Sequence, residues 1–180
     1  MNRQQLEHVL RAAARITGNL DILVIGGQSV LGAVPEDQLP IGVTTSIKVD
    51  VTFFDDPDDT KSDQVDEAIG ELSAFHETYG YYAQGVRITT AVLPRGWRLR
   101  TVVVESTSTA PGRGYCLDPH DCVVSQLVAG REKDLSCAEI LIREQLVDPA
   151  VLSDRVALLD GVHPLVLQRV INWLSRTDAL

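Results

Sequence analysis

The stretch that decides the fold is Ile25-Gly26-Gly27-Gln28-Ser29, together with a second stretch, Ser46-Ile47-Lys48-Val49-Asp50-Val51. The first stretch ends an apolar run at residues 21–25, which is typical of a buried strand bounded by a glycine turn. The second alternates apolar and polar residues, as a strand with one buried face does. This alternation places Lys48 and Asp50 on the same face, roughly 7 Å apart along the strand.

A strand that runs into two glycines and then a short helix is a favourable place for a phosphate group. Glycines allow a close approach of the backbone, and a helix N-terminus offers unpaired N–H groups. The same junction is also common for packing reasons alone, so by itself it indicates phosphate binding only weakly. The candidate nucleotide-binding residues at this junction are Gly26, Gly27, Gln28 and Ser29.

The polar face of the second strand bears on metal binding. Nucleotidyl transfer needs a divalent cation that bridges the triphosphate and neutralises the leaving pyrophosphate. Two carboxylates at positions i and i+2 of a strand hold such a cation, but here Lys48 stands at the partner position of Asp50. An ammonium group repels a metal ion. Lys48 could therefore contact a phosphate, or form an ion pair with Asp50 worth about 0–1 kcal/mol if exposed.

Periodicity along the rest of the chain predicts an α/β (α+β) protein with a mixed central sheet flanked by helices. Residues 1–115 form the α/β core, and residues 116–180 form a helical part that packs on it. Asp118 and Pro119 are typical of a helix N-cap and first turn. We expect helices at residues 4–18 and 28–34, in the acidic segment 55–70 starting after Pro57, from 119 onward, and at 133–145, 149–159 and 163–175. Strands are expected at 21–25, 46–54, 81–86 and 99–104, loops at 35–40 and 106–114, and a structured loop at 72–80.

Composition restricts the class of protein. The 180 residues, 44% of them hydrophobic, suffice for about one domain with a proper core. No apolar run approaches the roughly 18 residues that span a bilayer, and the N-terminus does not resemble a signal peptide. We therefore expect a cytoplasmic protein without a membrane partner. The odd number of cysteines, without CxxC spacing, predicts reduced packing residues: Cys116, Cys122 and Cys137.

The charges are unevenly placed along the chain. A formal net charge of -9 argues against a nucleic-acid-binding surface that covers the whole protein. Acidic residues crowd positions 55–67, whereas five arginines lie in a stretch that is poor in acids: Arg87, Arg95, Arg98, Arg100 and Arg113. A polyanion or an acidic protein could dock on this arginine stretch. The alternative is two ordinary solvated faces of opposite sign.

Four further stretches extend the pattern beyond the glycine turn and the polar-faced strand. They are Phe75-His76-Glu77-Thr78-Tyr79-Gly80-Tyr81-Tyr82-Ala83-Gln84-Gly85-Val86, Ala91-Val92-Leu93-Pro94-Arg95-Gly96-Trp97, Leu117-Asp118-Pro119-His120-Asp121 and Leu127-Val128-Ala129-Gly130-Arg131-Glu132-Lys133-Asp134. Taken together, over roughly residues 20–145, the chain resembles the minimal nucleotidyltransferases of the AbiEii/MenT toxin type.

The resemblance implies a nucleotidyltransferase fold and the transfer of nucleotides from a nucleoside triphosphate to RNA, at the acceptor end of tRNA. It implies Mg²⁺ as cofactor, with Asp50 as a metal carboxylate and Asp134 as a further acid. Some relatives act in toxin–antitoxin pairs, so a cognate antitoxin is a candidate partner. The candidate catalytic residues are Ser46, Lys48, Asp50, Gln126 and Asp134.

Two positions depart from the family pattern. Lys48 stands where the family has an acid, and Gln126 stands where a lysine contacts phosphate. Removing a metal carboxylate usually costs several kcal/mol of transition-state stabilisation. The alternative is therefore a nucleotidyltransferase-like protein that has lost catalysis and serves as a binding or interaction protein. Arg131 and Lys133 are candidate contacts to phosphates or the RNA backbone, or solvated residues at a helix end.

Two other side chains have two interpretations each. His76 beside Glu77 could act as a general base or stabilise a tight loop. Trp97 belongs to the core or stacks on a base near Arg95 and Arg98. If helical geometry continued across Gly130, Gln126 and Asp134 would share a face and Gln126 would point into the site.

Overall fold

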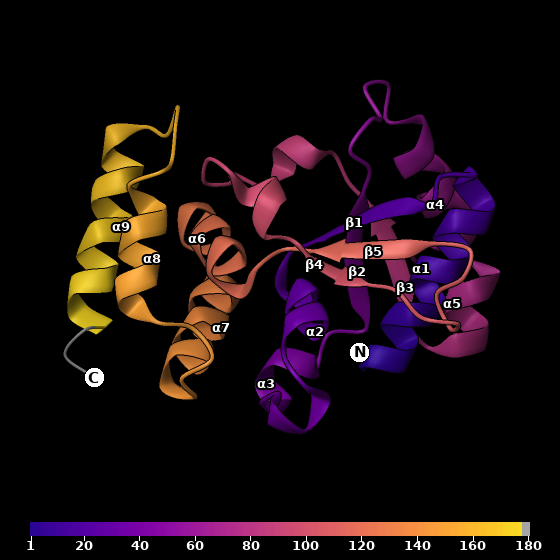
Figure 1. The fold of residues 1–180 in the computed structure, drawn as a ribbon, viewed down its shortest axis with the longest axis horizontal. Helices are drawn as coiled ribbons and strands as arrows, with labels where there is room; N and C mark the ends of the chain where they lie inside the picture. The colour runs from indigo at the N-terminus through magenta and orange to yellow at the C-terminus, as the bar shows by residue number, and fades with distance from the viewer. Residues whose placement is uncertain (178–180) are drawn as a thin grey trace.

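The computed structural model describes residues 1–177 and shows an α+β fold built on a five-stranded mixed sheet (Figure 1). The strands are β1 (Asp21–Ile25), β2 (Lys48–Thr52), β3 (Tyr82–Gly85), β4 (Val102–Val104) and β5 (Arg113–Cys116). Their order is β3-β2-β1-β5-β4. β1 pairs antiparallel with β2 and parallel with β5, while β2 and β3 are parallel and β4 and β5 antiparallel. The expected combination of helices with a mixed central sheet is confirmed.

Helices lie at both ends of the elongated molecule. The α-helices of the described residues are α1 (Arg3–Thr17), α2 (Val30–Ala33), α3 (Ile41–Thr44), α4 (Thr60–Ile69), α5 (Ala74–Tyr79), α6 (Pro119–Ala129), α7 (Glu132–Arg143), α8 (Pro149–Val156) and α9 (Pro164–Thr177), and the 3₁₀ segments are η1 (Gly27–Ser29), η2 (Glu36–Gln38), η3 (Ile88–Thr90) and η4 (Trp97–Arg100). In Figure 1, α1, α4 and α5 lie at one end and α6 to α9 at the other, with the sheet, α2 and α3 between them.

Local sequence signals fix the ends of several helices. α1 begins with a capping box in which the side chains of Asn2 and Gln5 each accept the backbone N–H of the other residue, both at 2.9 Å. It ends at Gly18, whose φ of 68° is the left-handed conformation that favours glycine. α6 begins as predicted, because the Asp118 side chain accepts the His120 N–H at 3.0 Å and Pro119 occupies the first turn.

Three apolar clusters hold these layers together. One joins α1 and α4 to one face of the sheet and includes Leu10, Val49 and Val65. A second lies among α6 to α9 and takes in Val30 and Val43 from the segments that follow β1. A third, on the other face of β1, is built from Leu23, Ile25, Leu117 and Cys122. Burial of each large apolar side chain contributes about 1.5–3 kcal/mol.

The structure corrects two expected elements. Residues 72–80, predicted as a loop, contain α5, which begins where Ser73 Oγ accepts the His76 N–H at 3.2 Å. Residues 106–114, also predicted as a loop, overlap the unpredicted strand β5. β5 lacks the β-branched residues that mark a strand in sequence, and it is formed by parallel pairing with β1. A Cβ on Gly114 would lie 2.6 Å from a methyl of Leu10, so α1 packs directly on this strand.

The arginine stretch is not the acid-poor surface that the local sequence suggests. Each of four arginines pairs with an acid from elsewhere in the chain: Arg87 with Asp59, Arg95 with Asp160, Arg100 with Asp121 and Arg113 with Asp21. Arg98 lies over the rings of Phe54 and Trp97, at 5.6 and 5.5 Å from their centroids. Trp97 in turn stacks on Phe54, which favours its core interpretation. These pairs leave little free positive charge for a polyanion.

His8 on α1 gives the fold a pH dependence. Its ring packs against Phe75, Tyr79 and Tyr81, and its Nδ1 lies 2.7 Å from the hydroxyl of Tyr81. Burial, and secondarily the charge of Arg11, lower the pKa of His8. Below about pH 6.5 the unfolded chain therefore binds more protons at this residue than the folded chain does. The free energy of unfolding is expected to fall as the pH drops through 6.5 toward the lowered pKa.

Urea unfolding at a series of pH values between 7.5 and 5 measures this effect. We expect His8→Gln to reduce the slope of stability against pH over that range, and the exposed His163→Gln to retain the wild-type slope. An unchanged slope in His8→Gln would contradict the assignment.

Candidate functional site

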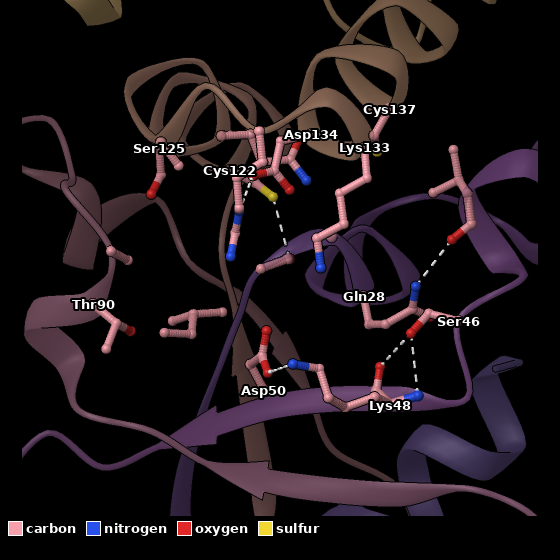
Figure 2. A pocket seen from close by; sticks show the side chains of 18 of the residues that line it. Gln28, Ser46, Lys48, Asp50, Thr90, Cys122, Ser125, Lys133, Asp134 and Cys137 are labelled. Atoms are coloured by element: carbon pink, nitrogen blue, oxygen red, sulfur yellow. Dashed lines mark hydrogen bonds and ion pairs between the residues drawn. The ribbon is translucent and has the colours of Figure 1, made fainter. Parts of the chain in front are cut away.

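A pocket of about 440 Å³ opens between the sheet and the C-terminal helices (Figure 2). β2, the glycine turn after β1, and the facing ends of α6 and α7 contribute to its lining. All the candidate residues from the sequence except Ser29 line it: Gly26, Gly27, Gln28, Ser46, Lys48, Asp50, Gln126, Arg131, Lys133 and Asp134. Ser29 is fully buried and is not among the lining residues. Residues from four separate segments of the chain thus meet at one cavity.

The glycine turn approaches its neighbours closely. Gly26 has φ 70° and ψ −174°, a conformation that is almost confined to glycine. A Cβ on Gly26 would lie 2.8 Å from Asp50 Oδ2, and one on Gly27 would lie 3.3 Å from Gln126 Nε2. The thiol of Cys122 on α6 donates to the Gly26 carbonyl at 3.2 Å. The two glycines therefore permit the turn to pack against both β2 and α6.

Lys48 and Asp50 form an ion pair, which was one of the two alternatives that the sequence left open. The Lys48 Nζ lies 2.9 Å from Asp50 Oδ1 and donates to Gln84 Oε1 on the neighbouring strand β3 at 2.6 Å. The two side chains of the ion pair are 30% and 29% exposed. Ser46 Oγ accepts the Lys48 N–H at 3.1 Å and donates to the Lys48 carbonyl at 2.9 Å. Ser46 thereby fixes the backbone where β2 begins.

These residues do not fit Mg²⁺ as they are arranged. Mg²⁺ demands octahedral oxygen ligation and is usually held by one or two carboxylates with waters and phosphates. Asp50 pairs with an ammonium, and Asp134 Oδ2 lies 2.5 Å from Nε of Arg131. Both candidate carboxylates thus have cationic partners. Within residues 1–177, no group of three or more His, Cys, Asp or Glu side chains could hold a metal ion.

Positive charge exceeds negative charge in the pocket. Among residues 1–177, the lining cations are Lys48, Arg131 and Lys133 and the lining anions are Asp50 and Asp134, so three positive groups face two negative groups. Figure 2 shows Lys133 reaching from α7 toward β2. No carboxylate among residues 1–177 pairs with it. A cavity with an excess cation in a chain of net charge -9 favours an anionic ligand.

Two buried amide oxygens at the pocket lack donors. Gln28 and Gln126 are each 6% exposed, and within the described chain their Oε1 atoms have no hydrogen-bond partner. Gln28 Nε2 donates to the Val43 carbonyl at 2.9 Å, which fixes the orientation of that amide. A buried acceptor without a donor costs about 1–3 kcal/mol. The amide oxygens of Gln28 and Gln126 need hydrogen-bond donors. Hydroxyl and amino groups supply such donors, whereas phosphate oxygens only accept.

Gln126 and Asp134 reach the pocket from two different helices. α6 ends at Gly130, whose φ is 68°, so helical geometry does not continue to Asp134 on α7. Both side chains nevertheless line the cavity, although the continuous helix that was the stated condition for this is not formed. Arg169 on α9 donates from Nη2 to the carbonyls of Leu127 and Val128, at 3.2 and 2.7 Å. α9 thereby caps the end of α6 next to the pocket, a role that the sequence did not predict.

The structure also separates residues that belong to the site from those that do not. His76 accepts the Leu72 N–H at 3.1 Å and packs against Tyr82, outside the pocket lining, which favours its structural interpretation.

The three cysteines are free, as expected, and burial raises the pKa of Cys116 and Cys122 to about 12. Sequence reasoning missed several lining residues because no local signal marks them: Gln84, Thr90, Cys122, Ser125 and Cys137.

Within residues 1–177, no helix combines the length and the apolar character needed to cross a membrane. No protein-family model, curated protein or solved structure matches the chain, so the geometry of the pocket carries the functional argument.

Proposed function

We propose that the chain is a nucleotidyltransferase-like protein that binds a nucleoside triphosphate in this pocket. The observation that carries the proposal is the pairing of an excess of positive charge with two buried acceptors that lack donors, Gln28 Oε1 and Gln126 Oε1. Phosphate groups match the charge. The sugar hydroxyls, or the amino group of a base, match the two acceptors. A nucleotide supplies both kinds of group in one ligand.

Four lining side chains then have roles that their chemistry allows. Lys133 and Lys48 have ammonium groups that donate to phosphate oxygens. Gln28 and Gln126, whose amides stand at the cavity wall, are the candidate contacts to the nucleoside end of the ligand. The absence of a side chain at Gly26 lets the turn lie against Asp50, since a Cβ there would be 2.8 Å from Asp50 Oδ2.

The geometry favours a protein that binds the nucleotide without transferring it. This corresponds to the catalytically degenerate alternative. Catalysis of the family type needs a metal between carboxylates, and here Lys48 occupies the position beside Asp50. Nucleotidyl transfer to the tRNA acceptor end is a second candidate, favoured by the meeting of Asp50 and Asp134 at one pocket. A cognate antitoxin stays a proposed partner on the resemblance alone.

Calorimetric titration with ATP, GTP, CTP and UTP tests the proposal. We expect at least one triphosphate to bind. Tripolyphosphate and the matching nucleoside should bind more weakly, because the first lacks the nucleoside contacts and the second lacks the phosphate contacts. Lys133→Ala should weaken the preferred triphosphate by about tenfold, the loss of one charge-assisted contact. Lys61→Ala on α4, which removes the same charge outside the pocket, should leave the affinity unchanged.

Two outcomes would decide against the proposal. If none of the four triphosphates produced heat, with or without Mg²⁺, the pocket would not be a nucleotide site. If labelled nucleotide were transferred to total tRNA by the wild-type chain, the second candidate would replace the first.

A further inference from the structure

The Lys48 ammonium stands beside the one carboxylate of β2 that could ligate a cation. We infer that it takes the place of the divalent ion, so that the pocket binds the metal-free triphosphate and Mg²⁺ opposes binding. This inference rests on the proposed function and specifies the chemical form of its ligand.

The position of the ammonium is set by two adjacent strands. β2 and β3 are parallel, and their register places Asp50 opposite Gln84. Lys48 Nζ lies 2.9 Å from Asp50 Oδ1 and 2.6 Å from Gln84 Oε1. An ammonium has three N–H groups, of which one donates to Gln84 Oε1, while the ion pair with Asp50 Oδ1 is not a hydrogen bond. Two N–H groups therefore have no acceptor within the described chain. The Lys48 side chain is 30% exposed and lines the pocket, where a phosphate oxygen can accept one of these N–H groups.

Asp50 and Gln84 act here as positioning residues for the ammonium. The carboxylate compensates its charge, and the amide oxygen holds it toward β3. Asp50 Oδ2 is itself confined, because it lies close to the Gly26 backbone. A fixed ammonium loses less side-chain entropy on contact with a phosphate than a freely rotating lysine does.

Charge arithmetic gives the direction of the Mg²⁺ effect. A triphosphate that has bound Mg²⁺ carries two fewer negative charges than the metal-free form. The pocket has three cationic groups against two anionic groups, so it attracts the more highly charged form. Mg²⁺ brought in with the ligand would also meet Lys48, Arg131 and Lys133. Asp50 and Asp134, the only carboxylates among residues 1–177 that line the pocket, are already paired with cations.

Titration of the full chain with each of the four triphosphates, in EDTA and in excess Mg²⁺, tests the inference. We expect wild-type binding to be at least about tenfold tighter in EDTA. Lys48→Met should weaken binding in EDTA by about tenfold and remove most of the difference between the two buffers. Lys61→Met, a matched loss of charge on α4, should behave as wild type.

A second measurement uses a metal without nucleotide. Mn²⁺, followed by electron paramagnetic resonance, is expected to bind Lys48→Glu and not the wild type, because only the variant has two carboxylates on one strand face. Far-ultraviolet circular dichroism checks that Lys48→Glu is folded. If that variant is unfolded, the comparison of wild type with Lys48→Met in the two buffers decides.

Different experimental results would overturn this inference and the proposed function. Tighter triphosphate binding in Mg²⁺ than in EDTA, or Mn²⁺ binding by the wild type that Asp50→Asn abolishes, would overturn the inference and leave the nucleotide site in place. The absence of binding by every triphosphate in both buffers would overturn the proposed function, and this inference with it.

Discussion

Asp121→Ala is expected to lower the free energy of unfolding by about 3 kcal/mol, the largest loss of stability that we predict. The Asp121 side chain is 0% exposed and lies at the start of α6. Arg100 of η4 donates to it from Nε at 2.8 Å and from Nη2 at 3.0 Å, and Nε of Arg155 on α8 is 3.3 Å away. Removing the carboxylate would leave two largely buried guanidinium groups without their shared counter-charge.

Urea unfolding followed by circular dichroism measures this loss. The matched control is Asp160→Ala, which removes the partner of Arg95 in an ion pair whose side chains are 68% and 71% exposed. Exposed pairs are worth less than about 1 kcal/mol, so this variant should unfold close to wild type. A loss in Asp121→Ala no larger than that in Asp160→Ala would show that the buried pair does not tie η4 and α8 to α6.

Gly26→Ala is expected to lower the free energy of unfolding by about 2–3 kcal/mol and to weaken triphosphate binding by at least about tenfold. The backbone of Gly26 has φ 70° and ψ −174°, which an alanine adopts only under strain. Its Cβ would also lie 2.8 Å from Asp50 Oδ2. The carboxylate would have to move, and Lys48 with it. The effect on binding therefore follows from the displacement of the ion pair and its ammonium.

Gly18→Ala separates these two causes. Gly18 has a φ of 68°, but a Cβ placed there would meet no atom within 4 Å. The free energy of unfolding of Gly18→Ala should therefore fall by only about 1 kcal/mol, the cost of placing alanine in the left-handed conformation. This variant should retain wild-type affinity for the triphosphate. Equal losses of stability in the two variants, or unchanged binding in Gly26→Ala, would contradict the role assigned to the glycine turn.

Much of the fold is predictable because its signals are local. The apolar run at residues 21–25 became β1, and alternation placed Lys48 and Asp50 on one face of β2. Asp118 and Pro119 marked the start of α6 because a cap needs only its own few residues. β5 was not predicted, because Arg113 and Gly114 do not favour a strand by themselves and pairing with β1 forms it.

The electrostatics of the chain depended on contacts between distant segments. The arginine stretch has few acids nearby in sequence, yet Asp21, Asp59, Asp121 and Asp160 are brought to it by folding. Charges that are close in sequence are thus a poor guide to free charge, since a Coulomb interaction depends on distance in space. The same reason explains why Gln84 was missed as a partner of Lys48.

The sequence by itself determined that a glycine turn precedes a strand on which Lys48 and Asp50 share a face, because the pleat of a strand has a period of two residues. Only the tertiary structure decided what that face contacts. Parallel pairing of β2 with β3 brought Gln84 to the Lys48 ammonium, and the packing of α7 brought Lys133 over the same cavity. Strand order and helix packing are set by the burial of apolar surface across the whole chain, so no local pattern specifies them.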